Sequence, residues 1–175
     1  VIILIDNSEF NLYKITSLIE KIIKNQNKNI KVISRLISVV NEKRIEHIFK
    51  SYSPEIIFHA AAYKHLPIVE ENIIEAIVNN VHGTLNMINS SKKFNSKKLV
   101  LISTDKAVRS TSIMGSSKRL AEMCIQAFAD EEVKTKGSLV LSMVRFGNVL
   151  NSSGSIVPLF RSQINEGGPI TVTHP

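Results

Sequence analysis

The chain has 175 residues, of which 43% are hydrophobic and 21% charged, as is typical of a globular protein. No apolar run approaches the roughly 18 residues of a membrane span and no segment resembles a signal peptide, so a soluble cytoplasmic chain is expected. The net charge of +7 would suit nucleic acid, but the lysines are scattered without aromatic neighbours, so no nucleic-acid partner is expected. The single cysteine, Cys124, excludes an internal disulfide and indicates a reducing compartment.

The first predicted elements are a strand at residues 1–5 and a helix that ends near Asn25. The strand is a continuous apolar run that ends at Asp6, as in a buried parallel strand. Ser8 can cap the helix, because its hydroxyl can accept a backbone N–H of the first turn. One face of this helix is apolar and carries Leu12, Ile15, Leu18, Ile19, Ile22 and Ile23.

Strands and helices then alternate to the end of the chain. Further strands are expected at residues 31–37, 55–60, 99–103 and 139–145, with a last short run at 170–172. Helices are expected at residues 42–50, 69–93, 114–130 and 156–165. This alternation predicts a single α/β domain with βαβ crossovers and a parallel sheet that helices cover on both faces. Because ligands bind at the carboxyl ends of such strands, the candidate segments are Asp6 and residues 37–41, 59–65, 103–112 and 145–155.

Three of these regions carry a resemblance to a known family. The segments are IIFHAAAYKHLPIVEENIIEAIVNNVHGTLNMI, LVLISTDKAVRSTSIMGSSKRLAEM and VRFGNVLNSSGSIVPLFRSQINEGGPITVTHP. With DNSEFNLYKI near the start, they resemble the CapD-like polysaccharide-biosynthesis family of extended short-chain dehydrogenases, whose characterised members are UDP-N-acetylglucosamine 4,6-dehydratases.

The resemblance implies a Rossmann-like doubly wound parallel sheet, in one incomplete NAD(P)-binding domain that spans residues 1–175. It also implies a UDP-sugar substrate and a role in bacterial surface-glycan synthesis. A homo-oligomer stays open. So does a membrane anchor in regions absent from this chain, which would hold the parent protein at the inner face of the membrane.

Catalytic residues follow from the same resemblance. Thr104, Asp105 and Lys106 match the family's Thr-Asp-Lys triplet. Met114 and Lys118 match the Tyr-x-x-x-Lys pair of short-chain dehydrogenases, with Met in place of Tyr. The implied reaction moves a hydride from sugar C4 to the nicotinamide, eliminates water across C5 and C6, and returns the hydride to C6. Elimination needs a base and an acid, and Lys106 and Asp105 can fill these roles.

Met114 closes the usual route for the proton of the C4 hydroxyl, because a thioether accepts no proton. Asp105, Thr104 or a bound water must take that proton, and the sequence does not choose among them. Met114 could instead be a core residue at the start of a helix. Lys118 is expected to bind the cofactor ribose, and the alternative is a plain surface lysine.

Asp6 ends the first strand, where an acidic residue can accept hydrogen bonds from the adenosine ribose hydroxyls. Residues 7–12 contain neither Arg nor Lys, and Glu9 would repel a 2′-phosphate, so NAD is favoured over NADP. A carboxylate that only stabilises a helix N-terminus is the alternative for Asp6. The other cofactor positions that the resemblance implies are Ser38, Val39, Ala60, Ala61, Tyr63 and Asn80.

The positions expected to contact the UDP-sugar are Lys64, His65, Arg145, Asn148 and Ser153. Arg145 and Asn148 would face the diphosphate, since a guanidinium binds phosphate oxygens with two hydrogen bonds. His59 is expected in the core or behind the site, and no metal site is expected.

The sequence lacks one feature of the implied fold, the G-x-G-x-x-G turn that follows the first strand. In the strand order 3-2-1-4-5-6 that first strand would lie between residues 1–5 and 55–58, so two inner edges should be unpaired or wrongly paired. The chain alone is therefore expected to be inactive. For the intact parent, the alternatives are a nucleotide-sugar 4-epimerase and a non-catalytic module that binds a nucleotide sugar or a dinucleotide.

Overall fold

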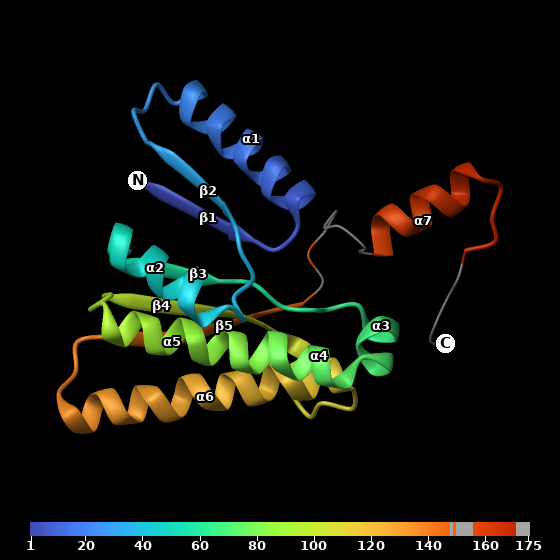
Figure 1. Ribbon diagram of the computed structural model, residues 1–175. Helices are drawn as coiled ribbons and strands as arrows, with labels where there is room; N and C mark the ends of the chain where they lie inside the picture. Colours follow the sequence, from blue (N-terminus) through green and yellow to red (C-terminus); the bar gives the residue numbers. More distant parts are fainter. Residues whose placement is uncertain (148, 150–155, 171–175) are drawn as a thin grey trace.

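The computed structural model describes residues 1–147, 149 and 156–170. Strands and helices alternate along these residues, as the sequence predicts (Figure 1). The strands are β1 (Ile2–Asp6), β2 (Val32–Leu36), β3 (Ile56–His59), β4 (Lys98–Thr104) and β5 (Val140–Phe146). The helices are α1 (Glu9–Asn25), α2 (Glu42–Tyr52), α3 (Leu66–Glu71), α4 (Ile73–Ile77), α5 (Gly83–Lys93), α6 (Ile113–Thr135) and α7 (Ile156–Asn165). A π-helical turn, η1 (Val78–His82), and a 3-10 turn, η2 (Asp105–Ala107), complete the described elements.

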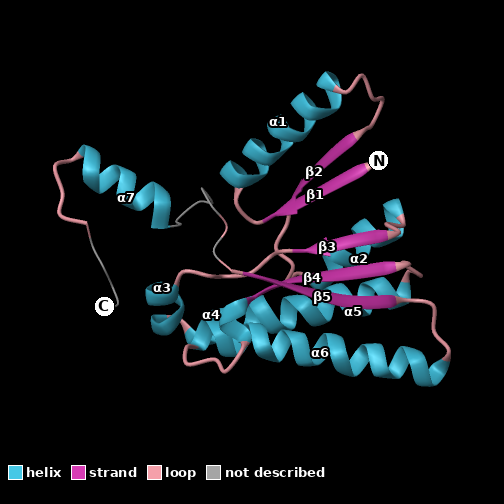
Figure 2. Cartoon of the chain, turned by 180° about the vertical axis from the view of Figure 1, so that it is seen from behind, coloured by secondary structure: helices cyan, strands magenta, loops and turns pink. Residues whose placement is uncertain are grey.

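The strands form two parallel sheets. One sheet pairs β1 with β2, and the other has the order β3-β4-β5. β1 and β3 are the neighbouring strands of the two sheets (Figure 2), and no described strand pairs with their inner edges. The α/β class and the parallel pairing are confirmed, and so are the two unpaired inner edges.

Helices α2, α5 and α6 form the core with the three-stranded sheet. Leu99 and Leu101 of β4 are fully buried, and the residues packed with them from the helices are Ile45, Phe49, Ile88 and Ile125. On the opposite face of the sheet, Ile56 and Phe58 of β3 are 54% and 72% exposed. For this sheet, helices cover one face only among the described residues.

Helix α1 covers the opposite face of the other sheet, where its Thr16 hydroxyl lies 2.7 Å from that of Ser34 on β2. Ile3 and Ile5 of β1 point to the other side and pack against the core.

The predicted helix at residues 69–93 begins earlier and is interrupted. Helix α3 begins at Leu66, and Pro67 occupies its first turn, where the fixed φ of proline suits a helix. Asn72, with φ of −129°, separates α3 from α4, and its side-chain amide donates to the Ile68 carbonyl at 2.8 Å. The turn η1 then precedes α5. Apolar periodicity continues across these breaks, so the sequence pattern could not show them.

The other predicted elements agree with the structure within a few residues. Helix α2 extends to Tyr52, and α6 runs from Ile113 to Thr135. The predicted run at residues 170–172 lies mostly outside the described residues. Cys124 is half-buried against the core, and burial raises the pKa of its thiol, as expected of a structural cysteine. Within the described part of the chain, no helix is both long and apolar enough to cross a membrane.

Candidate active site

The carboxyl end of β4 carries the predicted Thr104–Lys106 triplet. The Thr104 hydroxyl accepts the backbone N–H of Lys106 at 3.3 Å and donates to Asp105 Oδ1 at 2.9 Å. Lys106 Nζ lies 3.3 Å from the same carboxylate oxygen. The hydrogen bond from Thr104, together with that from Lys106, lowers the pKa of the Asp105 carboxyl, while partial burial opposes this. The turn η2 thus presents a carboxylate and an ammonium group side by side at the protein surface.

The first turn of α6 packs directly on this loop. The Ser112 hydroxyl caps the helix by accepting the backbone N–H of Gly115 at 3.1 Å. A Cβ at position 115 would overlap the carbonyl oxygen of Lys106 and would lie 3.0 Å from Cβ of Ser110. Gly115 is therefore required by the close approach of two backbones, and the helix start fixes where η2 can lie.

Lys118 follows one turn later on α6 and is 5% exposed. Its Nζ donates to the Ile102 carbonyl of β4 at 2.7 Å. Burial lowers the pKa of Lys118 to about 8, and the negative charge of Glu122 acts in the opposite direction. The alternative of a plain surface lysine is therefore wrong, and binding of a cofactor ribose stays a prediction.

Met114 is 5% exposed and packs in a small apolar cluster with Val69 of α3 and Ala76 of α4. This contact gives Met114 the role of a core residue at the start of a helix. Whether the side chain also contacts substrate stays a prediction.

Asn80 joins the loop after β3 to α6. Its Oδ1 accepts the backbone N–H of Tyr63 at 2.8 Å, and its Nδ2 donates to the Tyr63 carbonyl at 3.1 Å and to Ser117 Oγ at 3.0 Å. Asn80 is 1% exposed and lies in the π-helical turn η1. Such turns often occur at functional sites, because they redirect a side chain without ending the helix. Asn80 thereby fixes the Tyr63 backbone beside the start of α6.

The predicted cofactor residues that follow β1 and β2 lie on the other sheet. Asp6 Oδ1 accepts the backbone N–H of Ser8 at 2.7 Å, so this carboxylate does support the start of α1. After β2, Ser38 is half-buried, whereas Val39 is 7% exposed and would meet any Cβ placed at Gly83. Val39 therefore packs in the core, so only its backbone is suited to bind a cofactor.

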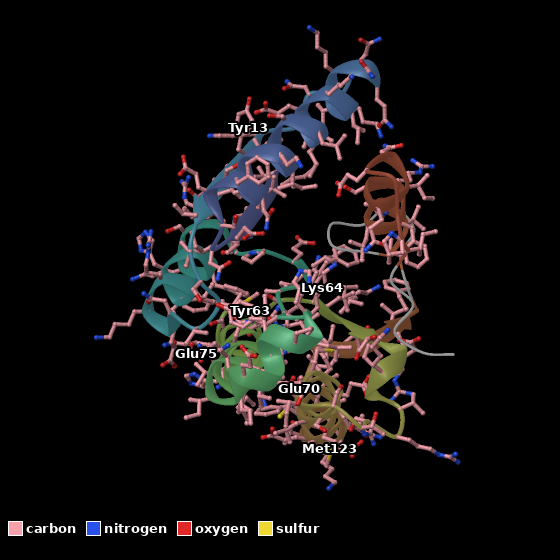
Figure 3. All side chains as sticks on the ribbon, turned by 90° about the vertical axis from the view of Figure 1, so that its right-hand side faces the viewer. Tyr13, Tyr63, Lys64, Glu70, Glu75 and Met123 are labelled. Atoms are coloured by element: carbon pink, nitrogen blue, oxygen red, sulfur yellow. The ribbon has the colours of Figure 1, made fainter. Side chains whose placement is uncertain are left out.

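The loop after β3 carries exposed candidate residues. Ala60 and Ala61 are exposed, and Tyr63 is 42% exposed. Tyr63 and Lys64 lie between the β1–α1 part of the chain and helix α3 (Figure 3). His65 is exposed at the N-terminus of α3. The structure thus leaves the side chains of Lys64 and His65 on the surface near the carboxyl end of β3, where a substrate could reach them.

Three predicted substrate residues remain, Arg145, Asn148 and Ser153. Arg145 binds Glu122 of α6 through Nε and Nη2, at 2.9 and 2.7 Å, so its guanidinium already holds a carboxylate. Contact of Arg145 with a diphosphate stays a prediction. Asn148 and Ser153 lie outside the described residues.

Glu122 and Ser117 are site residues that the sequence reasoning missed. A signal for Glu122 was present, because it follows Lys118 by four residues and so lies on the same helix face. The apolar neighbours Ala121 and Ile125 show that this face is buried, which makes a carboxylate there unusual.

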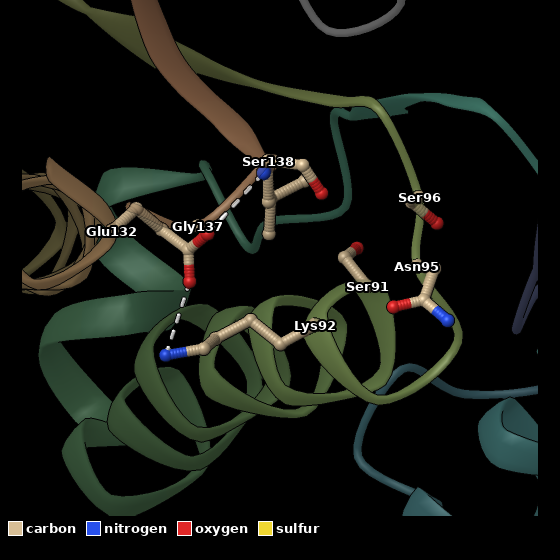
Figure 4. A pocket seen from close by; sticks show the side chains of 8 residues that line it. Ser91, Lys92, Asn95, Ser96, Glu132, Gly137 and Ser138 are labelled. Atoms are coloured by element: carbon tan, nitrogen blue, oxygen red, sulfur yellow. Dashed lines mark hydrogen bonds and ion pairs between the residues drawn. The ribbon is translucent and has the colours of Figure 1, made fainter. Parts of the chain in front are cut away.

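A small pocket lies at the opposite end of the sheet (Figure 4). It lies between the C-terminal ends of α5 and α6, and Lys92, Glu132 and Gly137 are among the residues that line it. Glu132 is held there by Lys92 at 3.2 Å and by the backbone N–H of Leu139 at 3.2 Å. This pocket is remote from the Thr104–Lys106 loop, because strand β4 separates the two. Among the described residues, no cluster of His, Cys, Asp or Glu side chains could hold a metal ion.

A nicotinamide dinucleotide fits this end of the fold in part. The ammonium group of Lys118 has three N–H donors, and one of them binds the Ile102 carbonyl. The hydroxyls of a ribose could accept hydrogen bonds from the same group. Asp6 supplies a carboxylate at the end of β1. The pyrophosphate would need the backbone amides of a glycine-rich turn, which this sequence does not contain.

Proteins of known name are similar in sequence to most of the chain. It is 44% identical over 174 residues to the capsular polysaccharide biosynthesis protein CapD of Staphylococcus aureus, covering 99% of this chain and 28% of that protein. It is 41% identical over 121 residues to a UDP-glucose 4-epimerase of Rickettsia canadensis, covering 69% of this chain and 35% of that protein. The chain thus spans about a third or less of each relative.

Solved structures match the fold. Pen from Bacillus thuringiensis superposes with a TM-score of 0.84 at 32% identity, over 99% of this chain and 52% of that one. The UDP-glucose 4-epimerase of Thermus thermophilus, solved in complex with NAD, has a TM-score of 0.71 at 17% identity, over 97% of this chain and 64% of that one. The family described as polysaccharide biosynthesis protein matches residues 1–175, and the chain therefore belongs to that family.

Proposed function

We propose that this chain is the catalytic part of an NAD-dependent nucleotide-sugar 4,6-dehydratase that acts on a UDP-N-acetylhexosamine in bacterial surface-glycan synthesis. The observation that carries the proposal is the pair Asp105 and Lys106, 3.3 Å apart at the carboxyl end of β4. Dehydration needs an acid and a base close together, whereas simple binding needs neither. Membership of the polysaccharide biosynthesis family supports a nucleotide sugar as the substrate class.

In the proposed reaction, Asp6 and Lys118 would hold the riboses of NAD, and the cofactor would supply a hydride acceptor for C4 and the hydride for C6. Lys106, as the neutral amine, would remove the C5 proton, and Asp105 would protonate the departing C6 hydroxyl so that water leaves. When hydride adds to C6, Lys106 would return its proton to C5. In the structure the ionised form of Asp105 is favoured, since its pKa is lowered by the hydrogen bonds of Thr104 and Lys106. Asp105 must therefore gain a proton before elimination. The 2.9 Å bond from the Thr104 hydroxyl supports a route by which the C4 hydroxyl proton reaches Asp105 through Thr104.

The test is incubation of the full-length protein with UDP-N-acetylglucosamine and NAD, followed by mass spectrometry. The proposal expects a product lighter by one water. Replacing Lys106 by Ala should abolish this product, because Lys106 is the proposed base and its neighbour Asp105 is needed as the acid. Lys97→Ala is a matched control, since Lys97 lies just before the start of β4, away from η2, and pairs with Glu55 on the surface. Unchanged turnover in Lys106→Ala would contradict the catalytic role of this loop.

A nucleotide-sugar 4-epimerase is the second candidate, and the relative of that name in Rickettsia canadensis favours it. An epimerase needs a group that exchanges the C4 hydroxyl proton but needs no C5 base. Met114 cannot exchange a proton, and Lys106 would have no task, so the dehydratase is preferred. The same mass spectrum separates the two, because an epimer has the mass of the substrate. If neither product forms but the nucleotide sugar binds, the chain belongs to a non-catalytic binding module.

NAD rather than NADP is the proposed cofactor. Asp6 and Glu9 place two carboxylates at the end of β1 and the start of α1, where a 2′-phosphate would be repelled. Titration of the full-length protein with the two dinucleotides should show tighter binding of NAD. NADP affinity equal to or above that of NAD would remove this assignment.

A further inference from the structure

Glu122 is a buried carboxylate that joins three elements around the candidate active site. It is 0% exposed and lies on α6. Its Oε1 accepts from Ser103 Oγ at 2.6 Å and from Arg145 Nε at 2.9 Å. Its Oε2 accepts from Arg145 Nη2 at 2.7 Å and from Arg119 Nη1 at 3.1 Å. Four donors from α6, β4 and β5 thus converge on one carboxylate.

The elements that Glu122 joins are those that carry the Thr104–Lys106 loop. Ser103 is the residue before Thr104, and Arg145 is the register partner of Ser103 on β5. The carboxyl ends of both strands are therefore held against α6 at the point where η2 begins. The carboxylate is buried but the Arg145 side chain is 40% exposed, and an ion pair open to solvent contributes little net stability, so a role in positioning is the better reason for this one.

Glu122 also acts on Lys118, which lies one helical turn earlier on the same face of α6. A second titratable group near Lys118 is His59 of β3, which burial keeps neutral at neutral pH by lowering its pKa to about 4. Burial disfavours the charge of Lys118, and the carboxylate of Glu122 favours it. Burial alone would raise the pKa of Glu122. The hydrogen bonds from Arg145, Ser103 and Arg119 outweigh this effect and lower the pKa to about 2, so Glu122 is ionised.

We propose that Glu122 is the positioning residue of this site: its carboxylate fixes the ends of β4 and β5 under the Thr104–Lys106 loop, and its charge favours the cationic form of Lys118. The part concerning turnover rests on the proposed dehydratase function. The part concerning Lys118 does not, so the two can be tested separately.

The first experiment compares the full-length wild-type protein with Glu122→Gln and with the control Glu132→Gln. Glu132 is also a poorly exposed carboxylate of α6, but it pairs with Lys92 at the far end of the helix. Competitive acetylation over a range of pH, quantified for Lys118 by mass spectrometry, measures the pKa of that ammonium. Glu122→Gln should lower this pKa, because the negative charge beside Lys118 is lost. Glu132→Gln should leave it unchanged. Equal values in all three proteins would overturn the proposal, whatever reaction the protein catalyses.

The second experiment measures turnover of UDP-N-acetylglucosamine by the same proteins. Loss of the support under Thr104 should lower kcat about 10- to 100-fold with little change in KM, as expected when catalytic groups move by roughly 1 Å. If the wild-type protein forms no dehydrated product, the proposed function fails, and the Lys118 measurement still decides the role of Glu122. If Glu122→Gln does not fold, Ser103→Ala replaces it, since this change removes one hydrogen bond and keeps all charges. A lower kcat at an unchanged melting temperature then supports the proposal, and an unchanged kcat overturns it.

Discussion

His59 shows how a residue at the end of a strand can belong to the core. It is 2% exposed, and its Nε2 lies 3.0 Å from the hydroxyl of Thr84 on α5. The prediction that His59 lies in the core is confirmed. Burial, and to a smaller extent the charge of Lys118, lowers the pKa of His59 to about 4 from its ordinary value of 6.5.

This burial makes stability depend on pH. The unfolded chain binds a proton on His59 near pH 6.5, but the folded chain binds it only near pH 4. The contribution of the neutral, buried His59 to the free energy of unfolding is therefore complete above pH 6.5. It is lost as the pH falls from 6.5 towards 4, and the total loss is about 3 kcal/mol. Urea unfolding at several pH values should show that the free energy of unfolding falls less on acidification in His59→Gln than in wild type. His47 is exposed, so His47→Gln should show the same dependence of unfolding free energy on pH as wild type. Parallel curves of unfolding free energy against pH for wild type and His59→Gln would contradict the prediction.

At the scale of elements, the contact between α6 and η2 sets the geometry of the site. It depends on Gly115, where any side chain would collide with the Lys106 backbone. A backbone carbonyl cannot move aside as a flexible side chain can. The contact is therefore a rigid constraint on the Thr104–Lys106 loop, and a substitution here should act on both stability and catalysis.

We expect Gly115→Ala to destabilise the protein by about 1–3 kcal/mol, because the overlap forces α6 and η2 apart. Turnover should fall more than thermal stability alone explains, since Lys106 moves with its carbonyl. The measurements are the thermal midpoint and kcat of the full-length protein. Gly137→Ala is the matched control, because the atoms that its Cβ would meet belong to the flexible side chain of Glu132. Equal effects of the two substitutions would show that the contact at Gly115 is not a constraint on the loop.

On the scale of the whole molecule, the two parallel sheets present facing edges at β1 and β3 that no described strand occupies. Asp6 lies on one sheet, and the Thr104–Lys106 loop lies on the other. A site that uses both needs the sheets to be held in a fixed relation. Unpaired strand edges also favour association with other chains, because their backbone groups remain available for hydrogen bonding.

The 175-residue chain expressed alone should therefore bind NAD poorly, form no 4-keto product and tend to aggregate. Its sequence has no glycine-rich turn to hold the pyrophosphate, and hydrogen bonds between described strands do not hold its two sheets together. Calorimetry with NAD and an activity assay, run beside the full-length protein, test this. Micromolar NAD affinity or measurable product from the isolated chain would show that it completes the site by itself.

The amino-acid sequence by itself determined the α/β class, the places of most strands and helices, and the position of the Thr104–Lys106 loop after β4. These features depend on local patterns, such as the apolar run that ends at Asp6, and local patterns survive without tertiary structure. The unpaired inner edges were also predictable, because a glycine-rich motif is either present in a sequence or absent from it.

Only the tertiary structure decided which side chains meet. Asn80 binds the Tyr63 backbone and Ser117, and Glu122 binds Ser103 and Arg145, across 17 to 37 residues of sequence. Such partners come together only when parallel strands pair and a helix crosses them, and periodicity does not describe that geometry. For the same reason the sequence could not show that a carboxylate on the neighbouring helix holds Arg145, whose contact with a diphosphate stays a prediction.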